Sequence, residues 1–254
     1  MIRTDVPADS RPAPTRADVS AATDPSWRAV LRGASDRAHG VLDQTLGPSL
    51  RGGRDYIRLL QVLHALHAEA DPLLERWVRT SQSFRHLTIA TRMPALASDL
   101  TALGMPPLER IQLHDLPRTS PGLLTDPAGV ALLYVIAGSS IGARVILRSL
   151  PLSVPQNARN GLTQGASTQS AALWSGLLTL LARPAPAIEA ASAHASCSLV
   201  FERILSHLER GASLEGRSSS GVGSEVKSRL QQVEGREAHA GVVKGHPRAQ
   251  VLTQ

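Results

Sequence analysis

The chain has 254 residues, of which 42% are hydrophobic and only 3% aromatic. This is enough apolar material for one sizeable core, and a core built from Ala, Leu, Val and Ile favours packed helices over a β-sandwich. The net charge of +6 comes almost entirely from arginine, but the arginines are scattered and no stacking platform or DNA-binding motif accompanies them, so nucleic-acid binding is not predicted.

Both ends of the chain differ in composition from its middle. Residues 1–23 lack the apolar region of a secretory signal and are expected to form a disordered leader, and residues 211–254 are expected to form a flexible tail. A single domain is predicted over residues 24–210. Its lone cysteine, Cys197, cannot form an internal disulfide, which fits a reducing cytoplasm. The uncharged, strongly apolar run of residues 128–143 is shorter than the ~20 residues that span a bilayer, so no membrane segment is expected.

Capping residues and apolar periodicity predict two helices in the first third of the domain. The first begins at Asp24-Pro25, a favoured cap and first-turn pair, and ends at Gly47-Pro48. The second begins near Asp55 with apolar residues at helical spacing, and it is expected to bend at Pro72.

The rest of the domain is also predicted to be helical. A third helix is expected over residues 84–103, broken at Pro94, followed by a loop over residues 104–125. Further helices are expected from Asp126-Pro127 to Pro151, over residues 169–181 and over residues 188–208. No β-hairpin signal and no repeat interrupts the series, so the fold class is predicted to be all-α.

One stretch of the first helix places three chemically useful side chains on one side. Arg32 lies seven residues before His39 and Asp43 lies four residues after it, which is about two turns and one turn of helix. A ring nitrogen of His39 can bind a metal or haem iron, a carboxylate can orient the other nitrogen, and Arg32 can neutralise an anion. The alternative is an ordinary solvated face, because such spacings are common on helices.

A second informative stretch is the pair Gly138 and Gly142 in the middle of a strongly helical segment. Each glycine costs about 1 kcal/mol of helix stability relative to alanine, so a compensating interaction is expected. The two share one face, where the backbone can approach either a flat ligand or a neighbouring helix. Arg144 and Arg148 lie one and two turns beyond and can reach the edge of such a ligand.

Taken together, these stretches resemble the biliverdin-producing haem oxygenase family, in particular the bacterial members that accompany bacteriophytochromes. The family's proximal pattern, Leu-Arg-x-Ala-Ser/Thr-x-x-x-His, matches Leu31 to His39, with Ser35 at the hydroxyl position. Its distal pattern, Tyr-Val-x-x-Gly-Ser-x-x-Gly-Gly/Ala, matches Tyr134 to Ala143. Weaker matches follow at residues 96–104, 172–174 and 201–208, so the resemblance covers about residues 27–210.

The resemblance implies a haem-oxygenase-like helical bundle that opens haem to biliverdin with release of CO and ferrous iron. Haem would be both substrate and cofactor, and dioxygen and an electron donor such as a ferredoxin or a flavodoxin-type reductase would be needed. A bacteriophytochrome is the expected acceptor of biliverdin. His39 would bind the iron with Asp43 behind it, Gly138 and Gly142 would lie near dioxygen, and the hydroxyls of Ser139 and Ser140 would order water. Ser35 and Tyr134 would line the site, and Arg32 and Arg148 would bind the propionates.

The sequence departs from the family pattern at two positions, and these leave alternatives open. Ser139 stands where animal-type enzymes have an aspartate, as is common in bacterial members, and Ala143 replaces the second of two glycines. One alternative is a protein of the same fold that carries or senses haem without degrading it. Another is a helical interaction protein that has lost the pocket.

Overall fold

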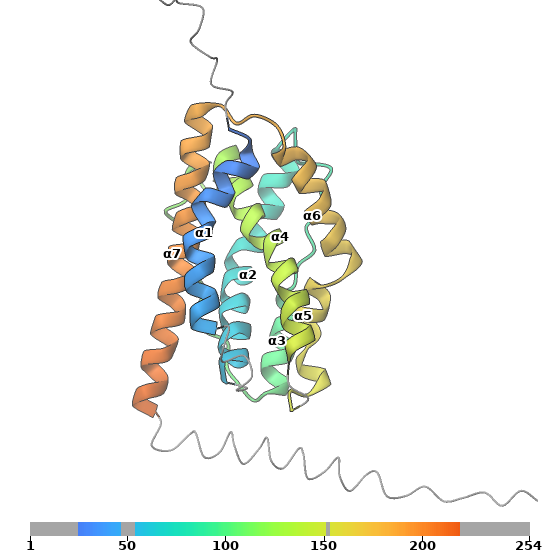
Figure 1. Ribbon diagram of the computed structural model, residues 1–254, viewed down its shortest axis with the longest axis vertical. Helices are drawn as coiled ribbons and strands as arrows, with labels where there is room; N and C mark the ends of the chain where they lie inside the picture. Colours follow the sequence, from blue (N-terminus) through green and yellow to red (C-terminus); the bar gives the residue numbers. More distant parts are fainter. Residues whose placement is uncertain (1–24, 47–53, 151–152, 219–254) are drawn as a thin grey trace, which may run out of the picture.

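The computed structural model describes residues 25–46, 54–150 and 153–218. This part of the chain is mostly helical, which confirms the all-α prediction (Figure 1). Its α-helices are α1 Trp27–Leu46, α2 Arg54–Thr80, α3 Met93–Ala102, α4 Asp126–Ser149, α5 Asn160–Gly165, α6 Thr168–Leu181 and α7 Ala187–Ser218. A short 3-10 helix, Gln156–Ala158, precedes α5.

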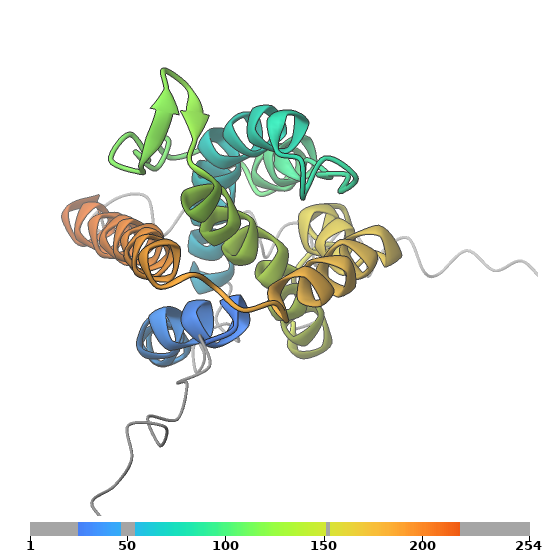
Figure 2. The ribbon, with the colours of Figure 1, turned by 90° about the horizontal axis from the view of Figure 1, so that it is seen from above.

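Helix α4 lies at the centre of the bundle. Seen from above, it crosses the middle of the molecule between α7 and α6 (Figure 2), and it packs against α2, α5, α6 and α7. Its N-terminal half is buried almost without interruption from Ala128 to Leu133. By length and composition α4 would also suffice to cross a membrane. The neighbours on several sides explain its apolar character as that of a core helix.

The predicted start of α4 is confirmed, and its cap can be identified. The side chain of Thr125 accepts a hydrogen bond from the backbone N–H of Ala128, and a proline follows in the first turn. Both features satisfy the requirements of a helix N-terminus. Helix α2 continues through Pro72 to Thr80, so the predicted second helix is longer than its apolar repeat suggested.

Two predictions for residues 84–125 are wrong. The third helix begins only at Met93, because Pro94 occupies its first turn, where the missing N–H costs nothing, and does not break it. The loop contains a β-hairpin of β1 Arg118–Ser120 and β2 Leu123–Leu124. Gly122 supplies the positive φ of 79° that its turn requires, so Pro121-Gly122 was the hairpin signal.

Helices α1 and α7 lie side by side at one edge of the bundle, and both also contact the core (Figures 1 and 2). The chain enters α1 through a bridge between Ser26 and Pro184, and the N–H of Trp27 donates to the carbonyl of Arg183. The predicted cap Asp24 lies outside the described residues. Helix α7 continues to Ser218, so the tail predicted from residue 211 begins as helix.

Candidate functional site

Helices α1 and α4 are joined at one level by a polar contact. The phenol of Tyr134 on α4 interacts with the side chain of Ser35 on α1, whose hydroxyl donates to the carbonyl of Arg32 at 3.1 Å. Burial raises the pKa of the Tyr134 phenol, so it stays protonated at neutral pH. Nearer the start of both helices, Trp27 and Val130 line the same cavity. The two helices therefore run in the same direction, and below the Ser35–Tyr134 contact they diverge (Figure 1).

His39 lies one turn beyond Ser35 on α1. Its imidazole is exposed, and its ring lies edge-on to the buried ring of Phe201 on α7, with 4.9 Å between centroids and 68° between planes. Phe201 thus supports one side of the imidazole. The rest of the ring is free to bind a ligand.

Gly138 lies one turn beyond Tyr134 on α4, and Gly142 one turn further. A Cβ built on Gly142 meets no described atom within 4 Å outside its own stretch of helix, and one on Gly138 meets only Trp174, at 3.6 Å. Among the described residues, close helix packing therefore does not account for either glycine. His39 lies one turn beyond Ser35 and Gly138 one turn beyond Tyr134, so the imidazole and the glycine pair lie on the second halves of α1 and α4.

Apolar side chains are exposed on the second halves of both helices. Val41 on α1 is 38% exposed, and Ile141 and Val145 on α4 are 45% and 62% exposed. These side chains are available for apolar contact with a ligand.

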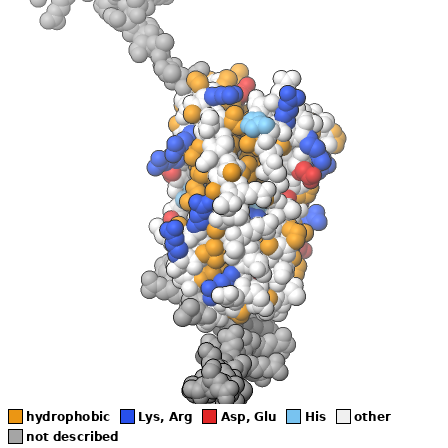
Figure 3. All heavy atoms as spheres, turned by 90° about the vertical axis from the view of Figure 1, so that its right-hand side faces the viewer, with side chains coloured by type: hydrophobic (Ala, Val, Ile, Leu, Met, Phe, Trp, Pro, Cys, Tyr) orange, Lys and Arg blue, Asp and Glu red, His pale blue; other side chains and the backbone are white. Residues whose placement is uncertain are grey.

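We call the side of α4 that carries Gly138 and Gly142 the glycine face. Trp174 on α6 covers the end of this face nearest to Tyr134. Its ring lies 5.6 Å from that of Tyr134, and its edge is the nearest group to Gly138. Figure 3 shows the side of the molecule where α5 and α6 lie, and hydrophobic side chains form a vertical band there with basic side chains at its borders. This combination suits a ligand that is mostly apolar and carries acidic groups.

The two serines of the distal motif are already engaged. The hydroxyl of Ser140 donates to the carbonyl of Ala137 at 2.6 Å, and that of Ser139 donates to the carbonyl of Ile136 at 2.7 Å. Ser139 also accepts a hydrogen bond of 2.9 Å from Nη1 of Arg92. The geometry thus gives both hydroxyls a role within the protein, and their ordering of water stays a prediction.

The predicted charged residues lie at the surface. Arg32 is exposed and lies 3.8 Å from Asp36, one turn along α1. Asp43 and Arg148 are also exposed, and within the described residues Asp43 has no hydrogen bond to His39. All three side chains are free to move toward a ligand, and their roles stay predictions.

Other histidines do not form a competing metal centre. No group of three His, Cys, Asp or Glu side chains that could hold a metal comes together in the described ranges. His67 is fully buried, and its Nδ1 lies 2.8 Å from Asp71.

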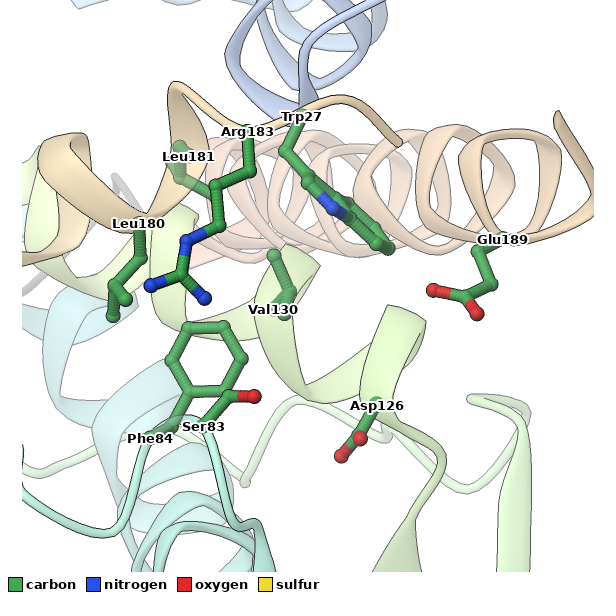
Figure 4. A pocket seen from close by; sticks show the side chains of 9 residues that line it. All are labelled: Trp27, Ser83, Phe84, Asp126, Val130, Leu180, Leu181, Arg183 and Glu189. Carbon is green, nitrogen blue, oxygen red and sulfur yellow. The ribbon is translucent and has the colours of Figure 1, made fainter. Parts of the chain in front are cut away.

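A separate cavity of about 140 Å³ lies where α1 and α4 begin (Figure 4). Aromatic, aliphatic and charged side chains line it: Trp27, Ser83, Phe84, Asp126, Val130, Leu180, Leu181, Arg183 and Glu189. Asp126 and Glu189 occupy the first turns of helices and Arg183 follows the end of one, as the helix dipole favours. The cavity lies at the first turns of α1 and α4, away from His39 and Gly142.

Neither family models nor curated proteins match this chain. Geometry adds three residues that the sequence motifs did not assign to the site: Trp174, Phe201 and Arg92. The first two fall in the weaker family-like stretches. Arg92 could not have been found this way, because only the fold brings it to Ser139.

Proposed function

We propose that this protein is a haem oxygenase that binds haem between α1 and the C-terminal half of α4 and opens it to biliverdin. The observation that carries the proposal is the pair of helix-weakening glycines that packing does not require, on a helix that diverges from the exposed His39. That geometry agrees with the order of the proximal and distal motifs in the sequence.

The residues present fit haem as substrate. His39 offers an imidazole, Gly138 and Gly142 offer bare backbone, and Val41, Ile141 and Val145 offer apolar contact for a porphyrin ring. When bound, haem would supply the iron that binds dioxygen and the ring that is opened, with CO and ferrous iron as the other products.

The protein's own groups would orient the substrate and limit access to it. Phe201 would keep the His39 ring from turning, and Trp174 would close the upper end of the glycine face. Arg32 and Arg148 would bind propionates, since a guanidinium pairs with a carboxylate in a two-pronged way. Electrons would come from a ferredoxin or flavodoxin-type reductase in the cytoplasm, and a bacteriophytochrome would take the biliverdin.

A carrier or sensor of haem is the alternative, and one observation favours it. The hydroxyls of Ser139 and Ser140 bond to their own helix, and the exposed side chains next to Gly142 include the apolar Ile141 and Val145. A distal face without a free polar group would bind haem but would not direct a proton to bound dioxygen.

Hemin titration followed by aerobic turnover tests the proposal. The parent protein is expected to give a Soret shift and, with reduced ferredoxin or ascorbate, biliverdin on chromatography. His39→Ala should lose the low-spin spectrum and the biliverdin, whereas the matched control His86→Ala, also at an exposed histidine, should behave as the parent. Hemin binding without biliverdin would establish the carrier, and no Soret shift at all would remove both functions.

A further inference from the structure

Arg92 is a buried arginine that joins three elements behind the glycine face. It is 3% exposed and stands at the N-terminus of α3. Its Nη1 donates to the hydroxyl of Ser139 on α4 at 2.9 Å, and its Nε donates to the carbonyl of Gly161 on α5 at 3.1 Å. A buried guanidinium is costly unless its hydrogen bonds are made, and here Nε and Nη1 have partners whereas the buried Nη2 has none among the described residues.

The surroundings are shaped to hold this guanidinium. A Cβ on Gly165 of α5 would lie 2.5 Å from Cζ of Arg92, so only glycine leaves room for the side chain there. The carboxylates of Asp71 on α2 and Asp99 on α3 act electrostatically on Arg92. Burial lowers the pKa of Arg92 to about 10, which leaves it charged at neutral pH.

The neighbouring acids are themselves fixed by the same part of the fold. Asp99 is fully buried and accepts hydrogen bonds from the backbone N–H groups of Asn160 and Gly161, at 2.9 Å and 2.7 Å. Asp71 accepts from the hydroxyl of Thr91 at 2.7 Å and pairs with His67. Arg92 therefore belongs to a buried polar cluster that is joined to α4 by its hydrogen bond to Ser139.

Ser139 directly follows Gly138, so a bond that fixes Ser139 also fixes the rotation of α4 about its own axis at that level. Beyond this point the helix is less supported, since residues 141, 142, 144 and 145 are all exposed. We propose that Arg92 is a positioning residue: through Ser139 it fixes the glycine face of α4 and places a positive charge behind it. The first part concerns the fold alone, and the effect on haem rests on the proposed function.

The first test uses the protein without hemin. Amide hydrogen exchange in peptides covering residues 136–146 should become about tenfold faster in Arg92→Met, because a buried hydrogen bond to a charged group is lost. Ser139→Ala should have a similar effect, and Arg79→Met, which removes an exposed ion pair with Glu75, should have none. Parental exchange in both Arg92→Met and Ser139→Ala would overturn the positioning role.

The second test uses the ferric hemin complex and separates charge from hydrogen bonding. The pH midpoint of its acid–alkaline spectral transition should rise by about half a unit or more in Arg92→Met, because a nearby positive charge is removed. Arg92→Lys, which keeps the charge, should stay near the parental midpoint. An unchanged midpoint in Arg92→Met would overturn the electrostatic part of the proposal.

The two tests also keep the proposals separable. If the parent protein binds no hemin, the proposed function fails while hydrogen exchange still decides whether Arg92 positions α4. If Arg92→Met does not fold, Ser139→Ala decides the positioning role alone, because it deletes only the hydroxyl that accepts from Arg92.

Discussion

The glycines in the N-terminal (upper) and C-terminal (lower) halves of α4 have opposite surroundings. In the upper half, a Cβ on Gly129 would lie 2.2 Å from the indole of Trp77, so the missing side chain is filled by the core. In the lower half, a Cβ on Gly142 meets open space. One helix thus contains a glycine that packing requires and another that packing does not, and only the second points to a ligand.

The largest effect on stability is expected in the buried, N-terminal half of α4. Gly129→Ala should lower the free energy of unfolding by about 3 kcal/mol or more, because the rigid indole of Trp77 also donates to Asp126 and cannot easily move away. Urea unfolding measures this. Gly40→Ala on α1 is the control, since nothing lies near its Cβ, and equal stability of the two variants would contradict the distinction.

The contact that separates the halves should matter less. Tyr134→Phe removes the hydroxyl that interacts with Ser35 and should cost about 1 kcal/mol of stability. Ser35→Ala removes the other partner of this interaction, so the loss in the double variant should be smaller than the sum of the two single losses. Fully additive losses would show that the two hydroxyls do not act together.

In the C-terminal half of α4, a methyl group in place of a glycine hydrogen should raise stability instead of lowering it. Gly142→Ala should raise the free energy of unfolding by up to about 1 kcal/mol, because alanine is the better helix former and nothing opposes its methyl group. Biliverdin yield should fall at the same time, because the methyl intrudes on the proposed haem face. Gly33→Ala on α1 should stabilise equally but leave turnover intact, so a drop in both variants would remove the catalytic role of Gly142.

The smallest effect concerns pH and two histidines of α2 and α7. Burial, and in second place the charge of a neighbouring side chain, lower the pKa of His64 and of His207 below 6.5. The unfolded chain therefore binds more protons, and stability should fall as the pH drops below about 6.5. Melting temperature between pH 7.5 and 5 measures this, and a parental slope in the variant with both His64→Gln and His207→Gln would assign the loss to other groups.

Sequence patterns predicted the helices that carry the motifs better than the segments between them. Helix α4 has a clear cap and a long apolar run, and α6 begins one residue before its predicted start, capped by the Ser167 side chain. Helix α5 was missed because six residues give too little periodicity. Pro94 lies in the first turn of α3, whereas Pro72 lies inside α2. Only tertiary packing decides between these two roles of proline.

The candidate site was predicted unevenly for a similar reason. Residues on one helix, such as His39 or the glycine pair, can be grouped by spacing, because three or four residues make one turn. Spacing cannot show which side chains from other helices join them. Phe201 reaches His39 from α7 and Arg92 reaches Ser139 from α3, and neither contact leaves a local trace in the sequence.

The central position of α4 has a consequence for how the chain is made. Its buried face is covered in part by α7, which begins at Ala187, well after α4 has ended at Ser149. During synthesis this long apolar helix therefore emerges before one of its main neighbours, and its surface is open to chaperones or to other nascent chains. A chain that ends before residue 187 would lack α7, and the face of α4 that α7 covers would stay exposed.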